Sequence, residues 1–469
     1  MSTKIIKNAG PSGSNYNYLS PFLLWSWINS MEKSIIIIGA GAAGLQAGRR
    51  LSKAGYTVTV LEAGALPGGR IHTLPIGAPA GFSMPVEGGA EFIHGELPLS
   101  LELAREAGVV LQPLHAHMVQ VRGEKEQDFH AGWDELFRQM EMLSADMPFA
   151  DFLAAYFSGD RHAGLRDSVR RMAEGYDLAD LRTASTKSLY REWAAEEEGE
   201  EEYRPQGGYQ RMIDFLARVC EEQGCAIRYR SVVGSVRWEQ GRVTVETVTG
   251  EVYTAPLLLC TASLGVLKTE GIRFSPDLPE THRLAIKKLG FGSVIKVLLE
   301  FDQPFWTHGR EAGQTLFVLS DAALPTWWTQ SADDCALITG WVAGDKMRAL
   351  QGMDAAARIT SALQSLATIF RLDEAVLRSR LKASLFLDWE AAPAIRGGYS
   401  FETVGSAEAR AVLSQSVEGT LFFGGEGLYE GDVPGTVEAA FCNGLTIADK
   451  IISSMHIVPA SRGSHPSRT

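Results

Sequence analysis

Residues 35–44 read Ile-Ile-Ile-Ile-Gly-Ala-Gly-Ala-Ala-Gly, a β-branched run that breaks into a glycine-rich turn. The isoleucines predict a short strand, and the alanine-rich segment after the turn predicts a helix. Gly39 permits a tight turn, Gly41 lets the backbone approach a diphosphate, and Gly44 lets the helix pack closely on the sheet. The free N–H groups and the positive end of the helix would then face the phosphates.

A second strand and an acidic residue follow at the spacing of a dinucleotide-binding unit. Residues 57–61 predict the strand, and Glu62 stands 18 residues after Gly44. A carboxylate at this place binds ribose hydroxyls. The order strand, helix, strand and acid favours an α/β fold with a dinucleotide site over a plain flexible loop, and we include Ala43 and Ala63 in that site.

Further motifs recur along the chain in a fixed order. They read G-G-R-I-H-T at 68–73, E-G-G-A-E-F-I-H-G at 87–95, Q-G-G-Y at 206–209, C-T-A-S-L-G-V-L-K at 260–268 and F-G-G-E-G at 423–427. Together they resemble the motifs of the flavin-containing amine oxidase family. That family includes monoamine oxidases, polyamine oxidases, L-amino-acid oxidases and histone-lysine demethylases. The resemblance covers about residues 33 to 455.

The resemblance implies that the dinucleotide is FAD. Gly398 stands where covalently flavinylated members carry cysteine, so we expect FAD to bind noncovalently. Arg70 would be a charge-paired anchor beside the diphosphate. The other residues that the resemblance assigns to FAD are Gly69, then Gly88, Gly89 and Ala90 at the flavin edge, Val233 at the adenine, Gly425 and Glu426 near the ribityl chain, and Thr436 and Val437 at the start of the last helix.

The implied architecture is a dinucleotide-binding domain of the glutathione-reductase and amine-oxidase type plus a mixed α+β substrate domain. A chain of 469 residues is too long for one compact core. We expect the FAD-binding domain to combine residues 31–96, 205–272 and 395–457, and the substrate domain to combine 97–204 and 273–394. Residues 1–30 would form an N-terminal extension and 458–469 a disordered tail.

The expected mechanism depends most on Lys296. It lies in a predicted strand at 294–301, where period-2 alternation places Ile295 and Val297 on one face and Lys296 on the other. From this pattern alone, a solvent-exposed lysine is favoured. The segment nevertheless resembles the family segment whose lysine holds a water molecule against flavin N5, and the resemblance implies this role for Lys296.

Residues 388–400 resemble the family element beside the isoalloxazine ring. Tyr399 falls where relatives place one wall of an aromatic cage, which suits an amine as a cation or as a neutral lone-pair donor. Trp389 is a further catalytic candidate, with simple packing as the alternative.

Three polar residues are candidates for contact with the substrate in the loop that reaches the flavin edge in relatives: Glu91, His94 and Glu96. For His94, a structural hydrogen-bonding role stays open. Asp432 and Val433 occupy the places where a second cage tyrosine is expected. A carboxylate there would instead suit a second positive charge on the substrate.

The resemblance implies FAD-dependent oxidation of a primary amine or a polyamine. Hydride would pass from the α-carbon to flavin N5, the imine would give an aldehyde, and O2 would become H2O2. An L-amino-acid oxidase is the first alternative, although residues 89–92 are acidic where such enzymes carry an arginine. A desaturase or protoporphyrinogen-oxidase-like enzyme, a histone demethylase and a flavin-binding module without activity are the others.

Composition limits the partners. A net charge of −12 argues against nucleic acid or an anionic membrane as the main partner. Five cysteines without metal-ligand spacing predict reduced thiols, no metal site and a cytoplasmic protein. The apolar patch at 21–28 is too short to span a membrane. If residues 1–30 act as a signal, the protein would be periplasmic or secreted instead. Monomer and homodimer both stay open.

Overall fold

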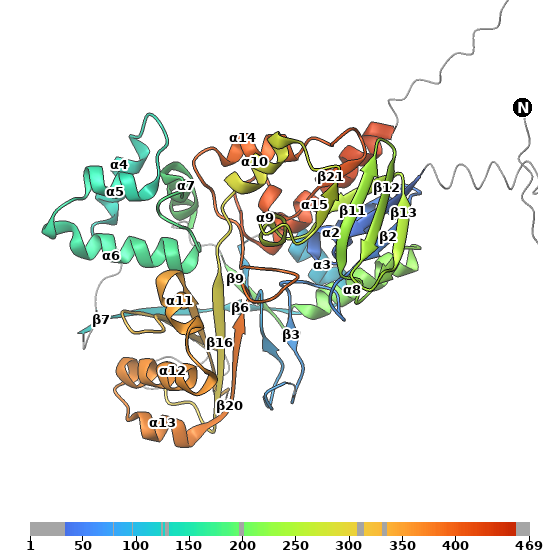
Figure 1. The fold of residues 1–469 in the computed structure, drawn as a ribbon. Coiled ribbons are helices and arrows are strands. Elements are labelled where there is room, and N and C mark those ends of the chain that lie inside the picture. The colour runs from blue at the N-terminus through green and yellow to red at the C-terminus, as the bar shows by residue number, and fades with distance from the viewer. Residues whose placement is uncertain are drawn as a thin grey trace, which may run out of the picture.

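The structure, a computed structural model, describes residues 33–77, 79–95, 97–122, 125–126, 131–196, 201–306, 314–330 and 335–455. The expectations for residues 1–30, Glu96 and residues 458–469 lie outside the described residues. Figure 1 shows two neighbouring sheets with their helices at the upper right, one containing β2 and the other β11, a further sheet with β16 and β20 below, and a group of helices at the upper left.

A five-stranded parallel sheet forms the centre of the first unit. Ile35 and Ile37 of its middle strand pack into one core, and Ile36 and Ile38 pack into another on the opposite face. The run of four isoleucines therefore reflects a strand that is buried on both faces. In order across the sheet, the strands are β10 (Ala226–Arg228), β2 (Thr57–Leu61), β1 (Ser34–Ile38), β14 (Leu257–Cys260) and β21 (Leu421–Phe423).

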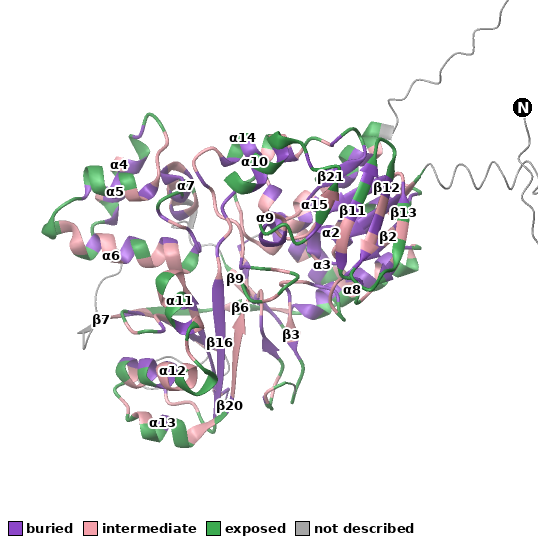
Figure 2. Cartoon of the chain, in the orientation of Figure 1, coloured by how far each residue is buried: buried purple, intermediate pink, exposed green. Residues whose placement is uncertain are grey.

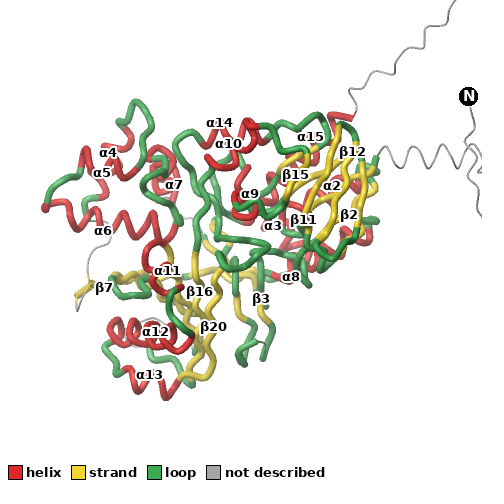
Figure 3. The backbone as a smooth tube through the Cα atoms, viewed as in Figure 1, coloured by secondary structure: helices red, strands yellow, loops and turns green. Residues whose placement is uncertain are grey.

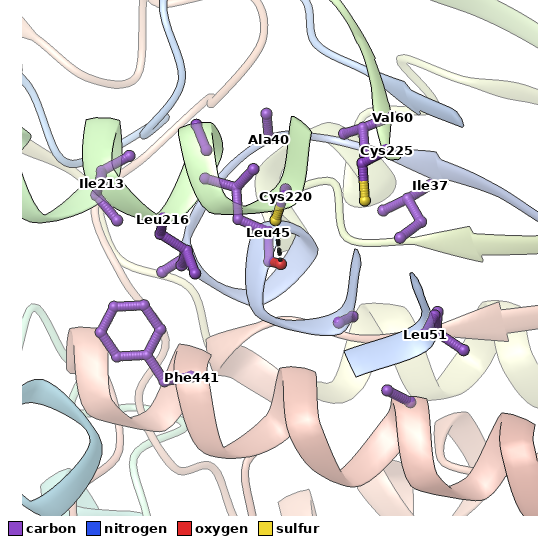
Figure 4. Packing of buried hydrophobic residues seen from close by; sticks show 14 of the residues in the cluster. Ile37, Ala40, Leu45, Leu51, Val60, Ile213, Leu216, Cys220, Cys225 and Phe441 are labelled. Atoms are coloured by element: carbon purple, nitrogen blue, oxygen red, sulfur yellow. Dashed lines mark hydrogen bonds between the residues drawn. The ribbon is translucent and has the colours of Figure 1, made fainter. Parts of the chain in front are cut away.

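Helices cover one face of this sheet. They are α2 (Ala42–Lys53), α3 (Pro98–Ala107), α8 (Gln210–Glu222) and α15 (Val437–Met455). In Figure 4, the Cys220 thiol of α8 donates to the carbonyl oxygen of Leu45 in α2 at 3.2 Å, among apolar side chains that include Phe441 of α15. The close contact between α2 and α8 holds the helix that follows the glycine turn against the sheet.

A second, smaller sheet and three helices cover the other face. The smaller sheet has the order β13 (Val252–Ala255), β12 (Arg242–Thr247), β11 (Val233–Glu239) and β15 (Arg273–Ser275). The helices are α9 (Leu264–Lys268), α10 (Glu280–Lys288) and α14 (Ser406–Leu413).

Two helices lie in ranges that the sequence assigns to the substrate domain, yet they pack into the cores around the five-stranded sheet. Leu103 and Ala104 of α3 belong to the core on the side of α2, and Ala285 and Ile286 of α10 belong to the core on the other side. Glu438 of α15 also accepts from the backbone N–H groups of Leu99 and Ser100, at 2.9 and 2.7 Å. By their packing, α3 and α10 are therefore part of the first unit.

The second unit is built on a seven-stranded sheet. One face carries an apolar core to which α11 (Gly344–Gln351), α12 (Ala355–Phe370) and α13 (Glu374–Arg380) contribute. In order, its strands are β20 (Leu381–Asp388), β16 (Val294–Phe301), β19 (Leu337–Ala343), β18 (Thr326–Thr329), β17 (Thr315–Ser320), β7 (Ala116–Arg122) and β8 (Lys125–Glu126).

Strand β16 is buried along its whole length, as Figure 2 shows. Ile295 and Val297 face the core that α11, α12 and α13 line. On the opposite face, Leu298 packs against the hairpin of β3 (Thr73–Leu74) and β4 (Val86–Glu87), and Lys296 contacts Gly89 and Glu91 in the segment that follows it. The solvent-exposed lysine that alternation alone favours is therefore wrong, because the hairpin and the segment that follows it cover the second face of this strand.

A helical group completes the described fold, and Figure 3 shows it on the side of the molecule away from β11 and β12. Its core includes Trp133, Phe149, Phe152 and Trp193. The helices are α4 (Trp133–Glu141), α5 (Phe149–Tyr156), α6 (Ala163–Arg171) and α7 (Thr186–Glu196), with the single turns η1 (Asp160–His162) and η2 (Met172–Tyr176).

A three-stranded sheet and one short turn remain. The sheet consists of β5 (Ile93–His94), β9 (Glu202–Pro205) and β6 (Leu111–Leu114), and η3 (Glu426–Leu428) follows β21. Within the described ranges, we find no helix with the length and apolar character needed to cross a bilayer.

The Glu87 carboxylate joins the hairpin β3–β4 to the start of α8. It accepts from the backbone N–H of Tyr209 at 2.6 Å and from the Thr73 hydroxyl at 2.8 Å. Burial raises the pKa of this carboxyl from 4.5 to about 7. The folded protein therefore binds this proton more tightly than the unfolded chain does.

Two glycines of α2 give a matched test of the turn. A Cβ at Gly44 would stand 2.0 Å from the Gly39 carbonyl oxygen, whereas a Cβ at Gly48 would meet no atom closer than 3.6 Å. We expect Gly44→Ala to lower the free energy of unfolding by about 3 kcal/mol or more and to weaken FAD binding. Gly48→Ala should change stability by no more than about 1 kcal/mol. Equal effects in chemical unfolding and FAD titration would contradict this view of the turn.

Glu87 predicts a pH-dependent stability. Because its folded pKa is raised, its stabilising contribution is complete below about pH 4.5 and is lost as pH rises through about 7. Relative to the wild type, Glu87→Gln should gain about 3 kcal/mol of stability between pH 4 and pH 8. Unfolding at a series of pH values measures this difference, and a difference that stays constant with pH would show that burial does not raise the Glu87 pKa.

Candidate functional site

The predicted dinucleotide cradle lies at the carboxyl end of β1. Gly39 has a φ of +102°, which favours glycine, and Gly41 is the residue before the first turn of α2. Within the described structure no side chain caps this helix, so the N–H groups of its first turn, including that of Ala43, stay available to an acceptor. An open backbone and a positive helix end fit a diphosphate.

The Glu62 carboxylate stabilises the same turn. Its two oxygens accept from the backbone N–H groups of Ala40 and Gly64, each at 2.7 Å. A carboxylate has about four acceptor positions, so it retains capacity for ribose hydroxyls. The Ser231 N–H donates to the Glu62 carbonyl at 2.8 Å, which brings the buried Val233 close to this acid. Ala63, next to Glu62, is half-buried.

An ion pair joins three distant segments next to the cradle. Arg70, after Gly69 with its φ of +61°, donates from Nη1 to Glu426 at 2.7 Å and to the Gly398 carbonyl at 2.9 Å. Glu426 also accepts from the N–H and the hydroxyl of Ser400. The Glu426 side chain is 5% exposed and the Arg70 side chain 29% exposed. The guanidinium therefore keeps an accessible side that can meet a phosphate.

The glycine pair at 88–89 lets two parts of the chain meet closely. A Cβ at Gly89 would stand 1.8 Å from the Arg70 carbonyl oxygen, and a Cβ at Gly88 would stand 2.8 Å from a Leu387 methyl group. The Ala90 N–H donates to the same Arg70 carbonyl at 3.0 Å. The Trp389 indole N–H donates to the Gly88 carbonyl at 3.0 Å, so this tryptophan holds the glycine segment.

The start of α15 lies at the same edge of the sheet. Thr436 caps this helix, because its hydroxyl accepts from the Ala439 N–H at 3.1 Å, and Val437 is the first helical residue. The Gly425 N–H donates to the Asn443 side chain at 2.8 Å. Strands β1, β14 and β21 run parallel and end at this edge, where ligands of open α/β sheets bind.

Lys296 lies in a buried cluster of charges. Its ammonium donates to Glu91 at 2.8 Å and to the Gly89 carbonyl at 3.0 Å, and the lysine side chain is 1% exposed. The Trp328 ring centre lies 5.4 Å from the ammonium nitrogen. An ammonium has three N–H donors, and these contacts occupy two of them, so one remains as far as the described residues are concerned.

Glu91 pairs with a second cation. Arg204 donates to it at 3.0 Å, and the side chains of Glu91 and Arg204 are 2% and 9% exposed. Burial disfavours the charged form, but the charges of Lys296 and Arg204 outweigh this effect and lower the pKa of Glu91 to about 2. Glu91, a candidate for substrate contact in the sequence, thus directs its carboxylate toward two cations of the protein.

Six aromatic rings contact one another next to this cluster, and we call this set the aromatic circuit. Its members are Tyr399, Trp341, Trp328, Phe92, His94 and Tyr176. Tyr399 stacks on Trp341 with centroids 6.3 Å apart, and Trp341 lies 6.0 Å from Trp328. Phe92 lies 5.9 Å from Trp328. The circuit closes through His94 and Tyr176, whose backbone carbonyl accepts from the Tyr399 hydroxyl.

The other substrate candidates lie around this circuit. His94 forms a contact of 2.7 Å with Glu202 through Nδ1, and its side chain is 38% exposed. Asp432 is exposed in the loop before α15. In the same loop, a Cβ at Gly435 would stand 3.1 Å from the Tyr399 ring. The ring that stacks on Tyr399 is Trp341, rather than a residue at 432 or 433.

Sequence reasoning missed Trp341, Trp328, Tyr176 and Arg204. The pair Trp327-Trp328 in a short β-branched run was a usable signal, because two consecutive tryptophans in a strand point to opposite faces. Trp327 faces the apolar core, and Trp328 faces Lys296. For Tyr176 and Arg204, no local pattern indicates a role.

Comparison with known proteins agrees with this geometry. The signature of the family described as flavin containing amine oxidoreductase matches residues 42–452. Lysine-specific histone demethylase 1 homolog 2 of Arabidopsis thaliana is 28% identical over 90% of this chain, which spans 58% of that protein. Polyamine oxidase 4 of Oryza sativa subsp. japonica is 27% identical, with 89% of this chain and 88% of that protein covered.

A solved structure of putrescine oxidase bound to putrescine has the same fold. It superimposes with a TM-score of 0.74 at 20% identity and covers 90% of this chain and 99% of its own. The chain spans 58% of the length of the Arabidopsis thaliana demethylase homologue above and 30% of that of homolog 3 from the same plant.

The turn at 39–44, Arg70 and the sheet edge fit FAD as the cofactor. Gly398 offers no side-chain atom for a covalent bond to FAD. The family signature covers most of the chain. This protein therefore belongs to the flavin-containing amine oxidoreductase family.

Proposed function

We propose that this protein oxidises an amine to an imine, with FAD as the hydride acceptor and O2 as the final electron acceptor. The observation that carries this proposal is the contact between Lys296 and the aromatic circuit. Lys296 lies 5.4 Å from the Trp328 ring centre, and Trp341 connects Trp328 to Tyr399. Lys296 and Tyr399, which the family resemblance associates with amine chemistry, are thus connected through two tryptophan rings.

The aromatic circuit would bind the amine and prepare it for reaction. Aromatic faces attract the ammonium form, and a site that excludes water favours the neutral amine, whose lone pair must be free. The Tyr399 ring is fixed by Trp341 on one side and by its hydrogen bond to Tyr176 on the other. A fixed ring orients the α-carbon without a conformational search.

When bound, FAD would supply a hydride acceptor at N5 and a route for the two electrons to O2, which would become H2O2. The amine loses a hydride from the α-carbon and a proton from nitrogen, and water converts the imine into an aldehyde and ammonia or a shorter amine. Lys296 would hold a water molecule with its third N–H group, because Glu91 and Gly89 take the other two.

A primary amine or a polyamine is the proposed substrate class. Asp432, exposed in the loop beside Tyr399, would attract a second positive charge of a polyamine. Methylated lysine is the second candidate, favoured by the 28% identity to a histone demethylase over 90% of this chain. We also propose that the protein acts in the cytoplasm, without nucleic acid as a partner.

A panel of amines tests the activity. Under anaerobic conditions, at least one of putrescine, spermidine, spermine, a simple monoamine or a methyl-lysine peptide should bleach the flavin, and air should restore the colour with release of H2O2. L-Amino acids are the control, because an arginine open to their carboxylate is expected only in an amino-acid oxidase. If no amine bleaches a correctly loaded protein, the proposed function is wrong.

Lys296→Met tests the lysine. The apolar side chain removes the donor to the water, so reoxidation by O2 should slow by about tenfold or more, while reduction by the amine changes less. Stopped-flow absorbance at the flavin band separates the two steps. Lys268→Met is the control, because the Lys268 ammonium donates to the Lys287 carbonyl rather than to the partners of Lys296. Unchanged reoxidation in Lys296→Met would remove Lys296 from the mechanism.

A further inference from the structure

Glu91 uses both carboxylate oxygens on partners within the protein. Oε2 accepts from Lys296 at 2.8 Å, and Oε1 accepts from Arg204 at 3.0 Å and from the Gln330 side chain at 3.3 Å. All three charged side chains are at least nine-tenths buried. In such surroundings, charges interact strongly because little water screens them.

Among the described residues, Glu91 is the carboxylate that pairs with Arg204. Its Nε and Nη1 atoms are buried and have no hydrogen-bond partner within the described part of the chain. The guanidinium carbon lies 5.0 Å from the Phe92 ring centre, which is a further attractive contact. A buried cation with these contacts loses its charge compensation when Glu91 is neutralised.

The charges in this cluster add to a positive excess when Glu87 is protonated. Lys296 and Arg204 are cations and Glu91 is an anion, while Glu87 on β4 is a second carboxyl that interacts with Lys296, and burial raises its pKa. The cluster adjoins the Gly89 carbonyl, in the segment that the family resemblance places at the flavin edge. A reduced flavin gains negative charge, so charges close to the flavin edge would affect its reduction potential.

We propose that Glu91 is a positioning residue for Lys296, and that Glu91 and Arg204 make opposite electrostatic contributions to the reduction potential of the bound flavin. This inference rests on the part of the proposed function that places Lys296 beside the flavin. It does not depend on which amine is oxidised. In this proposal the Glu91 carboxylate binds Lys296 and Arg204 instead of the substrate.

The test is the midpoint potential of the FAD-loaded protein, measured by reductive titration with a reference dye. Glu91→Gln removes a negative charge and should shift the potential upward. Arg204→Met removes a positive charge and should shift it downward, and the double variant should lie closer to the wild type than either single variant. Damage to the structure alone would not give shifts of opposite sign, and shifts of one sign would overturn the proposal.

A matched control removes another ion pair. Arg49 and Glu106 form a partly buried pair at 2.8 Å between α2 and α3, outside the cluster. Arg49→Met should therefore leave the potential unchanged. A shift as large as that of Arg204→Met would contradict the assignment to this cluster.

A second readout tests the positioning of Lys296 without any amine. Flavin reduced by light can be reoxidised with O2, and this rate should fall about tenfold in Glu91→Gln. If Glu91→Gln does not hold FAD, the comparison rests on Arg204→Met and Arg204→Lys. Arg204→Met should lower the midpoint potential, and Arg204→Lys should leave it unchanged. Any other result would overturn the proposal. Failure of the amine panel would leave these measurements interpretable, so the two proposals can fail separately.

Discussion

The edge of the five-stranded sheet is where segments hundreds of residues apart must meet, and the Arg70–Glu426 ion pair holds them together. Glu426 follows β21, and it accepts from Arg70 after β2 and from Ser400 before α14. Its side chain is 5% exposed, so loss of Arg70 would leave a buried charge without its counter-cation, at a cost of about 3 kcal/mol. The Arg70–Glu426 ion pair thus brings together the chain segments that form the proposed FAD site.

Strand β16 of the second unit lies against the hairpin β3–β4, which Glu87 joins to the start of α8 in the first unit. Because the hairpin covers one face of β16, Lys296 is enclosed between the two units. An isolated buried ammonium is costly, and Glu91 and the Gly89 carbonyl compensate its charge. The electrostatics near the flavin edge therefore depend on how the two units pack on each other.

Much of the fold could be predicted because its signals are local. A turn that needs positive φ at Gly39 and no Cβ at Gly44 leaves a short sequence pattern, and so does a strand with apolar residues on both faces. Helix α3 carries a local signal too, because it ends at Gly108 in the left-handed conformation that favours glycine. The domain to which α3 belongs was less predictable, because its packing partners α8 and α15 are far away in the chain.

The sequence by itself determined the glycine turn, the family and the cofactor class, because each follows from residues close together in the chain. Only the tertiary structure decided which side chains face Lys296. Glu91 and Arg204 are 113 residues apart, and Trp341 meets Tyr399 from another strand. Contacts of this kind arise when strands from different segments become neighbours, and no spacing along the chain encodes them.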